Sequence, residues 1–259
     1  MSSELRPPTS ELLREWGLEC GLVPLLFAPA AQDLLSRVDV AGRRVLDVGC
    51  GSGIVARLAR LGGASYVKGV DYCVDAVKVA KAVAPHPNVE FATFDLAQDD
   101  LGELGTFDVI VAAHVVEQIG TAMLANVAAC VAPGGHLVAS AWWNGVGLAH
   151  CPAYELIYTA TDLAEGYEPE FAKPPERLRE AASGLQIEVL EVSQVSTRPV
   201  DTAGRLVSAF LAGTTFGQKR TWAEHEAVME RAKPLVARID ASQGVPLRQA
   251  ILIARKPTR

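Results

Sequence analysis

Short apolar runs alternate with helical patterns along the first half of the chain. Five such runs have the length of buried strands, and they occupy residues 45–48, 66–70, 89–94, 107–114 and 136–142. Strands that alternate with helices form parallel sheets, because a parallel return needs a crossover connection. The pattern predicts an α/β fold with a doubly wound sheet.

The stretches between these runs predict the helices. After the first run, Ile54, Leu58 and Leu61 share one helical face with Val55 beside them, and two glycines follow as a stop. Asp75 has the place of an N-cap for the next helix. The predicted helices occupy residues 54–61, 75–83, 101–104 and 121–131. Pro133-Gly134-Gly135 predicts a type II turn before the fifth run.

The two ends of the chain show weaker patterns. Helical stretches are expected from about Ser10 and from Pro29, either as part of the core or as a cover over a site. Beyond the fifth run, we expect a helix at 174–183, a strand at 185–195, helices starting at Asp201 and Thr221, and a last strand at 246–256. Residues 145–173 have no clear period.

The first apolar run ends in three glycines at alternate positions, Gly49, Gly51 and Gly53. Glycines at a strand-to-helix turn leave backbone N–H groups accessible, so we expect this loop to bind an extended ligand. The dinucleotide pattern G-x-G-x-x-G, counted from Gly49, requires glycine where this chain has Ile54. The loop therefore departs from that fingerprint.

Acidic residues mark the ends of the next two strands. Asp71 can accept two hydrogen bonds from a ribose diol, and we expect it to be free because Asp75 caps the following helix. Asp95 ends the third strand, where it could bind a ligand or cap the short helix at 101–104. Nicotinamide enzymes also use an acid at the position of Asp71.

The sequence D-V-G-C-G-S-G, which starts at Asp47, resembles motif I of the class I S-adenosylmethionine-dependent methyltransferases. The resemblance implies a Rossmann-like, mostly parallel seven-stranded sheet with an antiparallel last strand and helical cap segments. It also implies S-adenosylmethionine as cofactor. In this family, acids contact the ammonium group, the ribose and the adenine of the cofactor, and the end of the fourth strand faces its sulfur. The residues that it assigns to the cofactor are Asp47, Gly49, Cys50, Gly51, Gly53, Asp71, Tyr72, Asp95, Leu96, Ala113 and His114.

The resemblance is firm over residues 43–140 and loose elsewhere. It suggests cap helices at 1–40, a cofactor-binding core at 41–144, and completion of the sheet with lid or substrate-binding insertions at 145–259, in one compact domain. It does not identify the methyl acceptor.

Transfer from a sulfonium needs alignment, exclusion of water and, for some acceptors, a base. The candidates for a catalytic role are His114, Glu117, His150 and Tyr154. His114 could act as a base or only hold a hydrogen bond, and we expect the second role. His114 would lie near the cofactor's positive sulfur, which disfavours a charged ring.

A net charge of −6 and a pI near 5.4 argue against a nucleic-acid or anionic membrane partner. A small, rather apolar acceptor is therefore expected, bound by a monomer or homodimer. Five widely spaced cysteines without C-x-x-C predict neither a disulfide framework nor a metal site, and they favour the cytoplasm. The N-terminus lacks the features of a signal peptide.

Two other functions remain open from the sequence. A protein that binds S-adenosylmethionine but catalyses a non-methyl reaction would keep every cofactor motif. A nicotinamide-dependent oxidoreductase would share the glycine loop and Asp71, but it would leave Asp47 and Asp95 unexplained.

Overall fold

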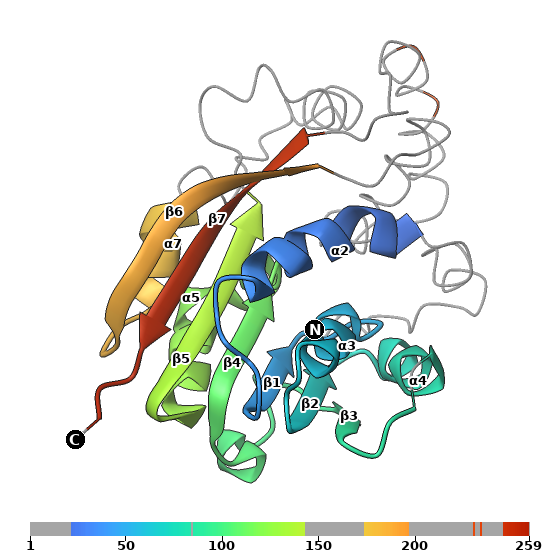
Figure 1. Cartoon of the computed structure of the whole chain (residues 1–259), viewed down its shortest axis with the longest axis horizontal. Helices are drawn as coiled ribbons and strands as arrows, with labels where there is room; N and C mark the ends of the chain where they lie inside the picture. Colours follow the sequence, from blue (N-terminus) through green and yellow to red (C-terminus); the bar gives the residue numbers. More distant parts are fainter. Residues whose placement is uncertain are drawn as a thin grey trace, which may run out of the picture.

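The computed structural model describes residues 22–83, 85–142, 174–196, 230, 234 and 246–258. Within them, seven strands form one sheet in the order β3-β2-β1-β4-β5-β7-β6 (Figure 1). The strands are β1 Arg44–Val48, β2 Tyr66–Asp71, β3 Val89–Thr93, β4 Phe107–Ala113, β5 Val131–Trp142, β6 Gln186–Ser196 and β7 Pro246–Arg255. β1 to β5 pair in parallel, and β7 runs antiparallel to both β5 and β6. The predicted fold class is confirmed.

Helices cover both faces of this sheet (Figure 1). They are α2 Leu22–Leu35, α3 Ile54–Leu61, α4 Val74–Val83, α5 Val116–Val127 and α7 Pro174–Ala181, with short 3-10 helices η1 Leu101–Leu104 and η2 Ala128–Cys130. α2, α3 and α4 share one core cluster with one face of the sheet, whereas α5 and α7 share a second cluster with the other. A doubly wound arrangement results, as the alternating pattern predicts.

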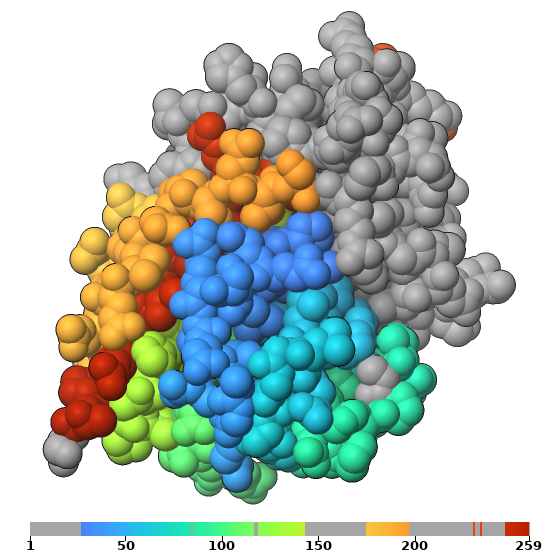
Figure 2. All heavy atoms as spheres, in the orientation of Figure 1, coloured from blue at the N-terminus to red at the C-terminus, as the bar shows by residue number. Residues whose placement is uncertain are grey.

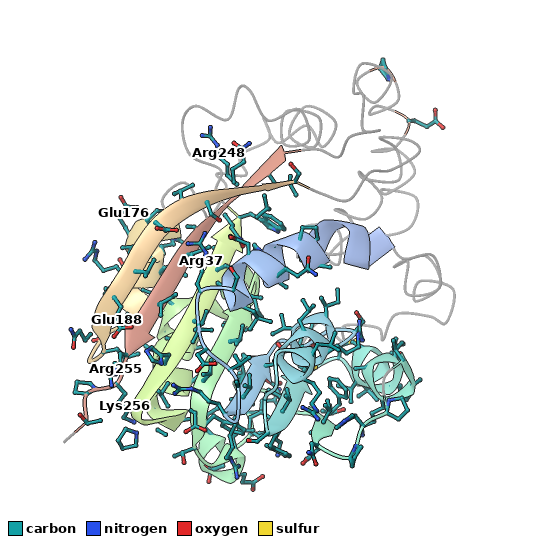
Figure 3. The ribbon with its side chains drawn as sticks, in the orientation of Figure 1. Arg37, Glu176, Glu188, Arg248, Arg255 and Lys256 are labelled. Carbon is teal, nitrogen blue, oxygen red and sulfur yellow. The ribbon has the colours of Figure 1, made fainter. Side chains whose placement is uncertain are left out.

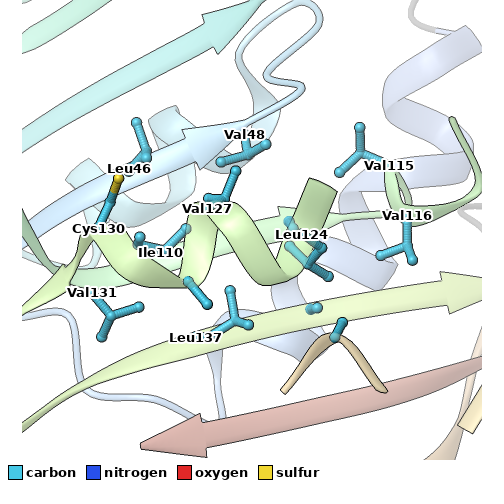
Figure 4. Close-up of a cluster of buried hydrophobic side chains, with 14 of the residues drawn as sticks. Leu46, Val48, Ile110, Val115, Val116, Leu124, Val127, Cys130, Val131 and Leu137 are labelled. Atoms are coloured by element: carbon cyan, nitrogen blue, oxygen red, sulfur yellow. The ribbon is translucent and has the colours of Figure 1, made fainter. Parts of the chain in front are cut away.

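Alternate side chains of the strands belong to different core clusters, one on each face of the sheet. In β1, Val45 packs beneath α2 and α3, whereas Leu46 and Val48 pack beneath α5 together with Ile110 of β4 (Figure 4). Successive side chains of a strand point to opposite faces, so Asp47 lies on the same face as Val45. Each fully buried aliphatic side chain contributes about 1.5 to 3 kcal/mol to stability.

β1 lies between β2 and β4, which places the crossovers from β1 and β4 on opposite faces of the sheet. In such sheets the crevice at the carboxyl ends of the strands, where the strand order reverses, is the usual ligand site. We call the side of the sheet where β1 to β5 end the carboxyl edge. It carries the glycine loop after β1 and the residues after β2, β3 and β4.

Helix α2 begins at Leu22 and runs through Pro29, so the predicted start at Pro29 is wrong. Proline resembles a first helical residue in sequence, but Ala28 and Ala30 are buried on either side of Pro29, and this burial holds the helix through the proline. The space-filling view shows α2 between the α3 and α4 segment and β6 (Figure 2). At its end, Arg37 reaches Glu191 of β6 (Figure 3).

Two further elements begin earlier than expected. α5 starts at Val116, and the chain leaves helical geometry at Gly120, with φ 75° and ψ 165°, before the helix resumes. β5 starts at Val131 and includes the glycines where a turn was predicted. Gly134 keeps a positive φ of 77°, but its N–H donates to the Lys256 carbonyl at 2.9 Å. This pairing with the end of the chain keeps the segment in the sheet.

The buried face of α3 also differs from the prediction. Val55, Ala56 and Ala59 are buried, whereas Leu61 is 83% exposed. Small residues at these positions let the helix approach the sheet closely, which the apolar spacing alone did not reveal. Among the described helices, none combines the length and apolar character that a membrane crossing requires. The helices predicted from Ser10 and Asp201 lie outside the described residues, as does the one predicted from Thr221 except for Glu230 and Pro234, which are helical. The division into segments remains a prediction.

Candidate active site

The three glycines of the loop after β1 all adopt positive φ, but they meet different surroundings. A Cβ on Gly49 would lie 2.4 Å from a methyl of Val115, and one on Gly53 would lie 2.6 Å from the ring of Phe91. A Cβ on Gly51 would meet no atom of the described residues within 4 Å. Packing therefore requires glycine at 49 and 53, and Gly51 faces open space that a ligand could occupy.

The loop uses its own N–H groups within the protein. The N–H of Cys50 donates to the Val70 carbonyl at 2.9 Å, and that of Gly53 donates to the Cys50 carbonyl at 2.7 Å. The N–H of Gly51 donates to Asp71 Oδ2 at 2.8 Å. The expectation of uncovered N–H groups is wrong at these three positions. At these three positions the loop lacks the free donors with which phosphate-binding loops hold anions.

Asp47 is 1% exposed and accepts one hydrogen bond, from the N–H of Ala56 in the first turn of α3, at 3.0 Å. Burial raises the pKa of Asp47 to about 7, the Ala56 hydrogen bond and Arg57 oppose the rise, and the charge of Asp71 adds to it. A buried carboxylate with a single hydrogen bond is costly unless a cation pairs with it. Asp47 could therefore hold the ammonium group of a ligand.

Asp71 bridges the glycine loop and the start of α4. Its Oδ1 accepts the N–H of Cys73 at 2.9 Å, while its Oδ2 accepts that of Gly51. The expectation that Asp75 caps α4 and leaves Asp71 free is wrong, since Asp75 lies in the first turn and pairs with Lys78 at 2.9 Å. Each carboxylate oxygen of Asp71 retains a second lone pair, so the group can still accept hydrogen bonds from a diol.

The charge at this point of the carboxyl edge is negative. Asp47 and Asp71 are close enough for the charge of Asp71 to raise the pKa of Asp47. Burial, followed by the charges of the same two acids, also raises the pKa of Cys50, which keeps its thiol protonated. Two acids beside occupied N–H groups oppose a pyrophosphate and favour a cationic ligand.

The ends of β2 and β3 bring Tyr72 and Asp95 together. Burial raises the pKa of Tyr72, and the charges of Asp71, Cys73 and Asp95 add to the rise. Asp95 accepts the N–H of Ala97 at 2.9 Å and the side-chain amide of Gln98 at 2.8 Å.

The short helix η1 is capped by Asp100 instead, so the alternative role suggested for Asp95 is wrong. Leu96 packs against the core, whereas Tyr72 is 50% exposed. Of these two side chains, Tyr72 is therefore the more accessible, and its ring is available to a flat ligand.

His114 follows Ala113 at the end of β4 and has a positive φ of 54°. Its ring is stacked on Trp142 with centroids 3.8 Å apart, and it meets Phe27 edge-on at 5.9 Å. Burial lowers the pKa of His114 to about 3, against a small opposing effect of Gln249. The ring is therefore neutral near pH 7.

The next residue, Val115, packs against Gly49, so the chain after β4 is in contact with the glycine loop. Ala113 is partly buried against the cluster under α2. Of the other catalytic candidates, His150, Tyr154 and the side chain of Glu117 lie outside the described residues. Within the part that the structure describes, no three His, Cys, Asp or Glu side chains are grouped to hold a metal.

Two residues near the site were missed from sequence. Arg57 donates to the Ser52 carbonyl at 2.6 Å and acts on the charge of Asp47. Gln249 is fully buried in β7, next to Trp142 in the strand register. A single glutamine inside the apolar run of the last strand was the available signal.

Residues 25–180, more than half of the chain, match a family model described as a methyltransferase domain. A ubiquinone biosynthesis O-methyltransferase from Xanthomonas oryzae pv. oryzae is 30% identical over 204 residues, which is 75% of this chain and 84% of that protein. The ribosomal protein L11 methyltransferase of Marinobacter nauticus is 31% identical over 165 residues, 64% of this chain. The match spans 51% of that relative and 32% of its counterpart from Ralstonia pickettii.

Solved structures share the fold at low identity. An S-adenosylmethionine-dependent methyltransferase from Mesorhizobium loti aligns with a TM-score of 0.50 and 22% identity, over 88% of this chain and 96% of its own. The [4+2]-cyclase SpnF aligns with a TM-score of 0.58 and 20% identity, over 90% of this chain and 82% of its own. From the family match, the relative from Xanthomonas and the seven-stranded fold, we conclude that this chain belongs to the class I S-adenosylmethionine-dependent methyltransferases.

Proposed function

We propose that the chain transfers a methyl group from S-adenosylmethionine to a small, rather apolar metabolite. The observation that carries this proposal is the group of three rings of Phe27, His114 and Trp142 beside the glycine loop. Sites for small apolar ligands are lined mainly by apolar and aromatic side chains with a few placed polar groups. His114 supplies such a polar group within this aromatic wall.

In this proposal the acids of the carboxyl edge hold the cofactor. Asp47 pairs with its ammonium group, Asp71 accepts hydrogen bonds from its ribose, and Tyr72 and Asp95 contact its adenine. The fit rests on the single hydrogen bond of buried Asp47 and on the open space in front of Gly51. In this proposal the cofactor passes through this open space, close to the loop backbone.

The bound cofactor supplies a methyl group on a positively charged sulfur, which is already activated for transfer. The chain aligns the acceptor and excludes water with the aromatic wall. A base works best when its pKa lies near the working pH. With a pKa lowered to about 3, the neutral ring of His114 is a weak proton acceptor. We therefore assign it a hydrogen bond to the bound molecules and not proton abstraction.

Replacement of His114 by alanine tests that assignment. We expect KM for the acceptor or the cofactor to rise, with a fall in kcat well below the 100-fold typical of a lost base. Steady-state kinetics with acceptors of different acidity measures the difference. A kcat loss of about 100-fold that more acidic acceptors restore would show that His114 is a base.

The charge of the chain and its relatives support a small acceptor. The net charge of −6 provides no broad basic surface for nucleic acid. The match to the ubiquinone biosynthesis O-methyltransferase spans 84% of that protein, whereas the match to the L11 methyltransferase of Marinobacter nauticus spans 51%. The first relative is thus matched over nearly its whole length.

A substrate screen tests the proposed function. Release of S-adenosylhomocysteine is followed over phenols, quinones, amines and carboxylic acids, with ribosomal protein L11 and RNA as competing acceptors. We expect turnover with a small apolar compound and none with RNA. Preferred methylation of L11 would overturn the proposal. Tight cofactor binding without methylation of any acceptor would favour a non-methyl reaction.

A further inference from the structure

A polar side chain of β7 lies beside His114 under helix α2. The strand register pairs Gln249 with Trp142 and Ile251 with Ser140, so these side chains share one face of the sheet. Ile251 belongs to the core cluster that α2 covers, which identifies the face. His114 is stacked on Trp142, and therefore both Gln249 and His114 are neighbours of the same indole ring.

The orientation of the Gln249 amide is determined by its partners. Its Nε2 donates to the Ala30 carbonyl at 3.2 Å and to Asp33 Oδ2 at 2.9 Å. A carbonyl and a carboxylate only accept hydrogen bonds, so the nitrogen, and not the oxygen, must face them. Asp33 is held in turn by the Ser193 hydroxyl at 2.7 Å and by Arg37 at 3.0 Å. Gln249 therefore presents Oε1 on its other side in a fixed direction.

The amide oxygen of Gln249 and the ring of His114 are complementary hydrogen-bonding groups that lie close together. Gln249 Oε1 and both ring nitrogens of His114 are buried and have no hydrogen-bond partner among the described residues. The two side chains lie close together because each neighbours the indole ring of Trp142, and Gln249 raises the pKa of His114 against the effect of burial. Buried polar groups are almost always paired, and these two are able to pair with each other.

We propose that Gln249 is a positioning residue that sets the tautomer of His114, and that the second ring nitrogen accepts a hydrogen from a hydroxyl or N–H group of the methyl acceptor. An amide oxygen only accepts, so the ring nitrogen beside it must carry the proton. The other nitrogen of a neutral ring then has a free lone pair, and it is buried without a partner among the residues that the structure describes. A ligand with a hydrogen-bond donor completes the group.

The second half of this inference rests on the proposed function, because it assigns the free nitrogen to the acceptor. A site that offers a buried hydrogen-bond acceptor discriminates against molecules that lack the matching donor. The chemistry therefore points to an acceptor that carries a hydroxyl or amine hydrogen next to an apolar body. The first half concerns only Gln249 and His114, and it can be tested without any substrate.

Nitrogen NMR of the histidine rings in the full chain tests the first half at pH 7. The signals of His114 are identified by their loss in His114→Asn. We expect wild type to show one protonated and one unprotonated nitrogen, and Gln249→Leu to bring the two shifts toward each other as both tautomers become populated. The matched control is Ser140→Ala, which removes from the same face a buried hydroxyl that has no partner within the described part of the chain, and it should leave the shifts unchanged.

A folded Gln249→Leu variant with the wild-type tautomer would overturn the positioning role. If this variant does not fold, as judged by near-ultraviolet circular dichroism, Gln249→Met provides the same test with an unbranched side chain. Addition of S-adenosylhomocysteine alone is a second measurement on the wild type. A large change in the unprotonated nitrogen would assign it to the cofactor and overturn the acceptor half.

The kinetic test uses an acceptor from the substrate screen. We expect Gln249→Leu to raise KM for the acceptor about tenfold or more, with KM for S-adenosylmethionine changed less than about threefold. For an acceptor analogue that lacks the donor hydrogen, the variant and the wild type should have similar KM values. Equal effects on both KM values would contradict the assignment. A screen that finds no acceptor would remove the proposed function and the acceptor half, whereas the NMR result would stand.

Discussion

At the scale of single residues, Asp47 is a buried acid whose charge lowers the stability of the fold, and we assign that charge to the ammonium group of the cofactor. It is ionisable, buried and provided with one backbone hydrogen bond, in a position where the fold itself gains little from its charge. The raised pKa means that the folded state binds a proton more tightly than the unfolded state, whose carboxyl group titrates near 3.8. The stabilisation by this proton is fully present at low pH and is lost as the pH rises from 3.8 to about 7.

We therefore expect Asp47→Asn to stabilise the cofactor-free protein at pH 8 and to weaken cofactor binding. The neutral amide avoids a cost of about 4 kcal/mol, at 1.36 kcal/mol for each pKa unit, and can still accept the Ala56 hydrogen bond. Urea unfolding at pH 8 and pH 4 measures the gain, which should vanish at the lower pH. A variant that is less stable at pH 8 would show that Asp47 has a structural role.

Cofactor affinity should depend on pH through the same residue. In the free protein Asp47 has a pKa of about 7, and only its ionised form pairs with an ammonium group. We expect the affinity for S-adenosylhomocysteine to fall about tenfold for each pH unit below 7 and to level off above it. Calorimetry between pH 5.5 and 7.5 measures the slope. Asp47→Asn should bind weakly with no such slope, and an unchanged slope in that variant would place the titration elsewhere.

At the scale of elements, the loop between β1 and α3 packs closely against its neighbours and also leaves room in front of its backbone. Gly49 and Gly53 allow the loop to pack against Val115 and Phe91, whereas Gly51 leaves room in front of the backbone. The loop is held to β2 by Asp71, so the glycine loop and the start of α4 share one carboxylate. Packing and binding can be separated by substitution within this one loop.

Gly51→Ala and Gly53→Ala form a matched pair for that separation. Gly51→Ala places a methyl group in open space, so we expect a stability loss of about 1 to 2 kcal/mol from its positive φ and at least a tenfold loss of cofactor affinity. Gly53→Ala adds a clash with Phe91, with an expected stability loss of about 2 to 4 kcal/mol. Denaturant unfolding and calorimetry compare the two. A larger stability loss at Gly51 would contradict the assignment.

At the scale of the whole molecule, the carboxyl edge gathers the ends of strands that are distant in sequence. It brings the acids Asp47, Asp71 and Asp95, at or after the ends of β1, β2 and β3, and the rings of His114 and Trp142, at the ends of β4 and β5, to the edge that carries the glycine loop. α2 joins this arrangement to the far end of the sheet, because Asp33 contacts both β6 and β7. We expect the negative charge at the edge to favour a cationic cofactor over an anionic dinucleotide.

That selection predicts which ligands stabilise the fold. S-adenosylhomocysteine at 100 times its Kd should raise the free energy of unfolding by about 2.7 kcal/mol, because it binds only the folded state. NAD at the same concentration should give no shift, since Asp47 and Asp71 oppose its pyrophosphate. Thermal unfolding with each ligand measures the difference. Stabilisation by NAD and not by S-adenosylhomocysteine would favour the oxidoreductase alternative.

The sequence by itself determined the class of fold, the order of its strands along the chain and the place of the glycine loop. These features are local, since a strand or helix pattern and a glycine run with Asp47 ahead of it can be recognised within a few residues. The seven strands and most helices accordingly lie within a few residues of their predicted bounds. Predictions failed where the outcome depended on a distant partner, as at Pro29 of α2 and the glycines of β5.

Only the tertiary structure decided how the site residues are used. Asp71 proved to be bonded to the loop, Asp100 and not Asp95 caps η1, and Leu96 joins the core. Gln249 meets His114 because β7 inserts next to β5 and α2 packs over both. Burial and hydrogen-bond partners arise from such long-range contacts, so no pattern within a short segment can specify them.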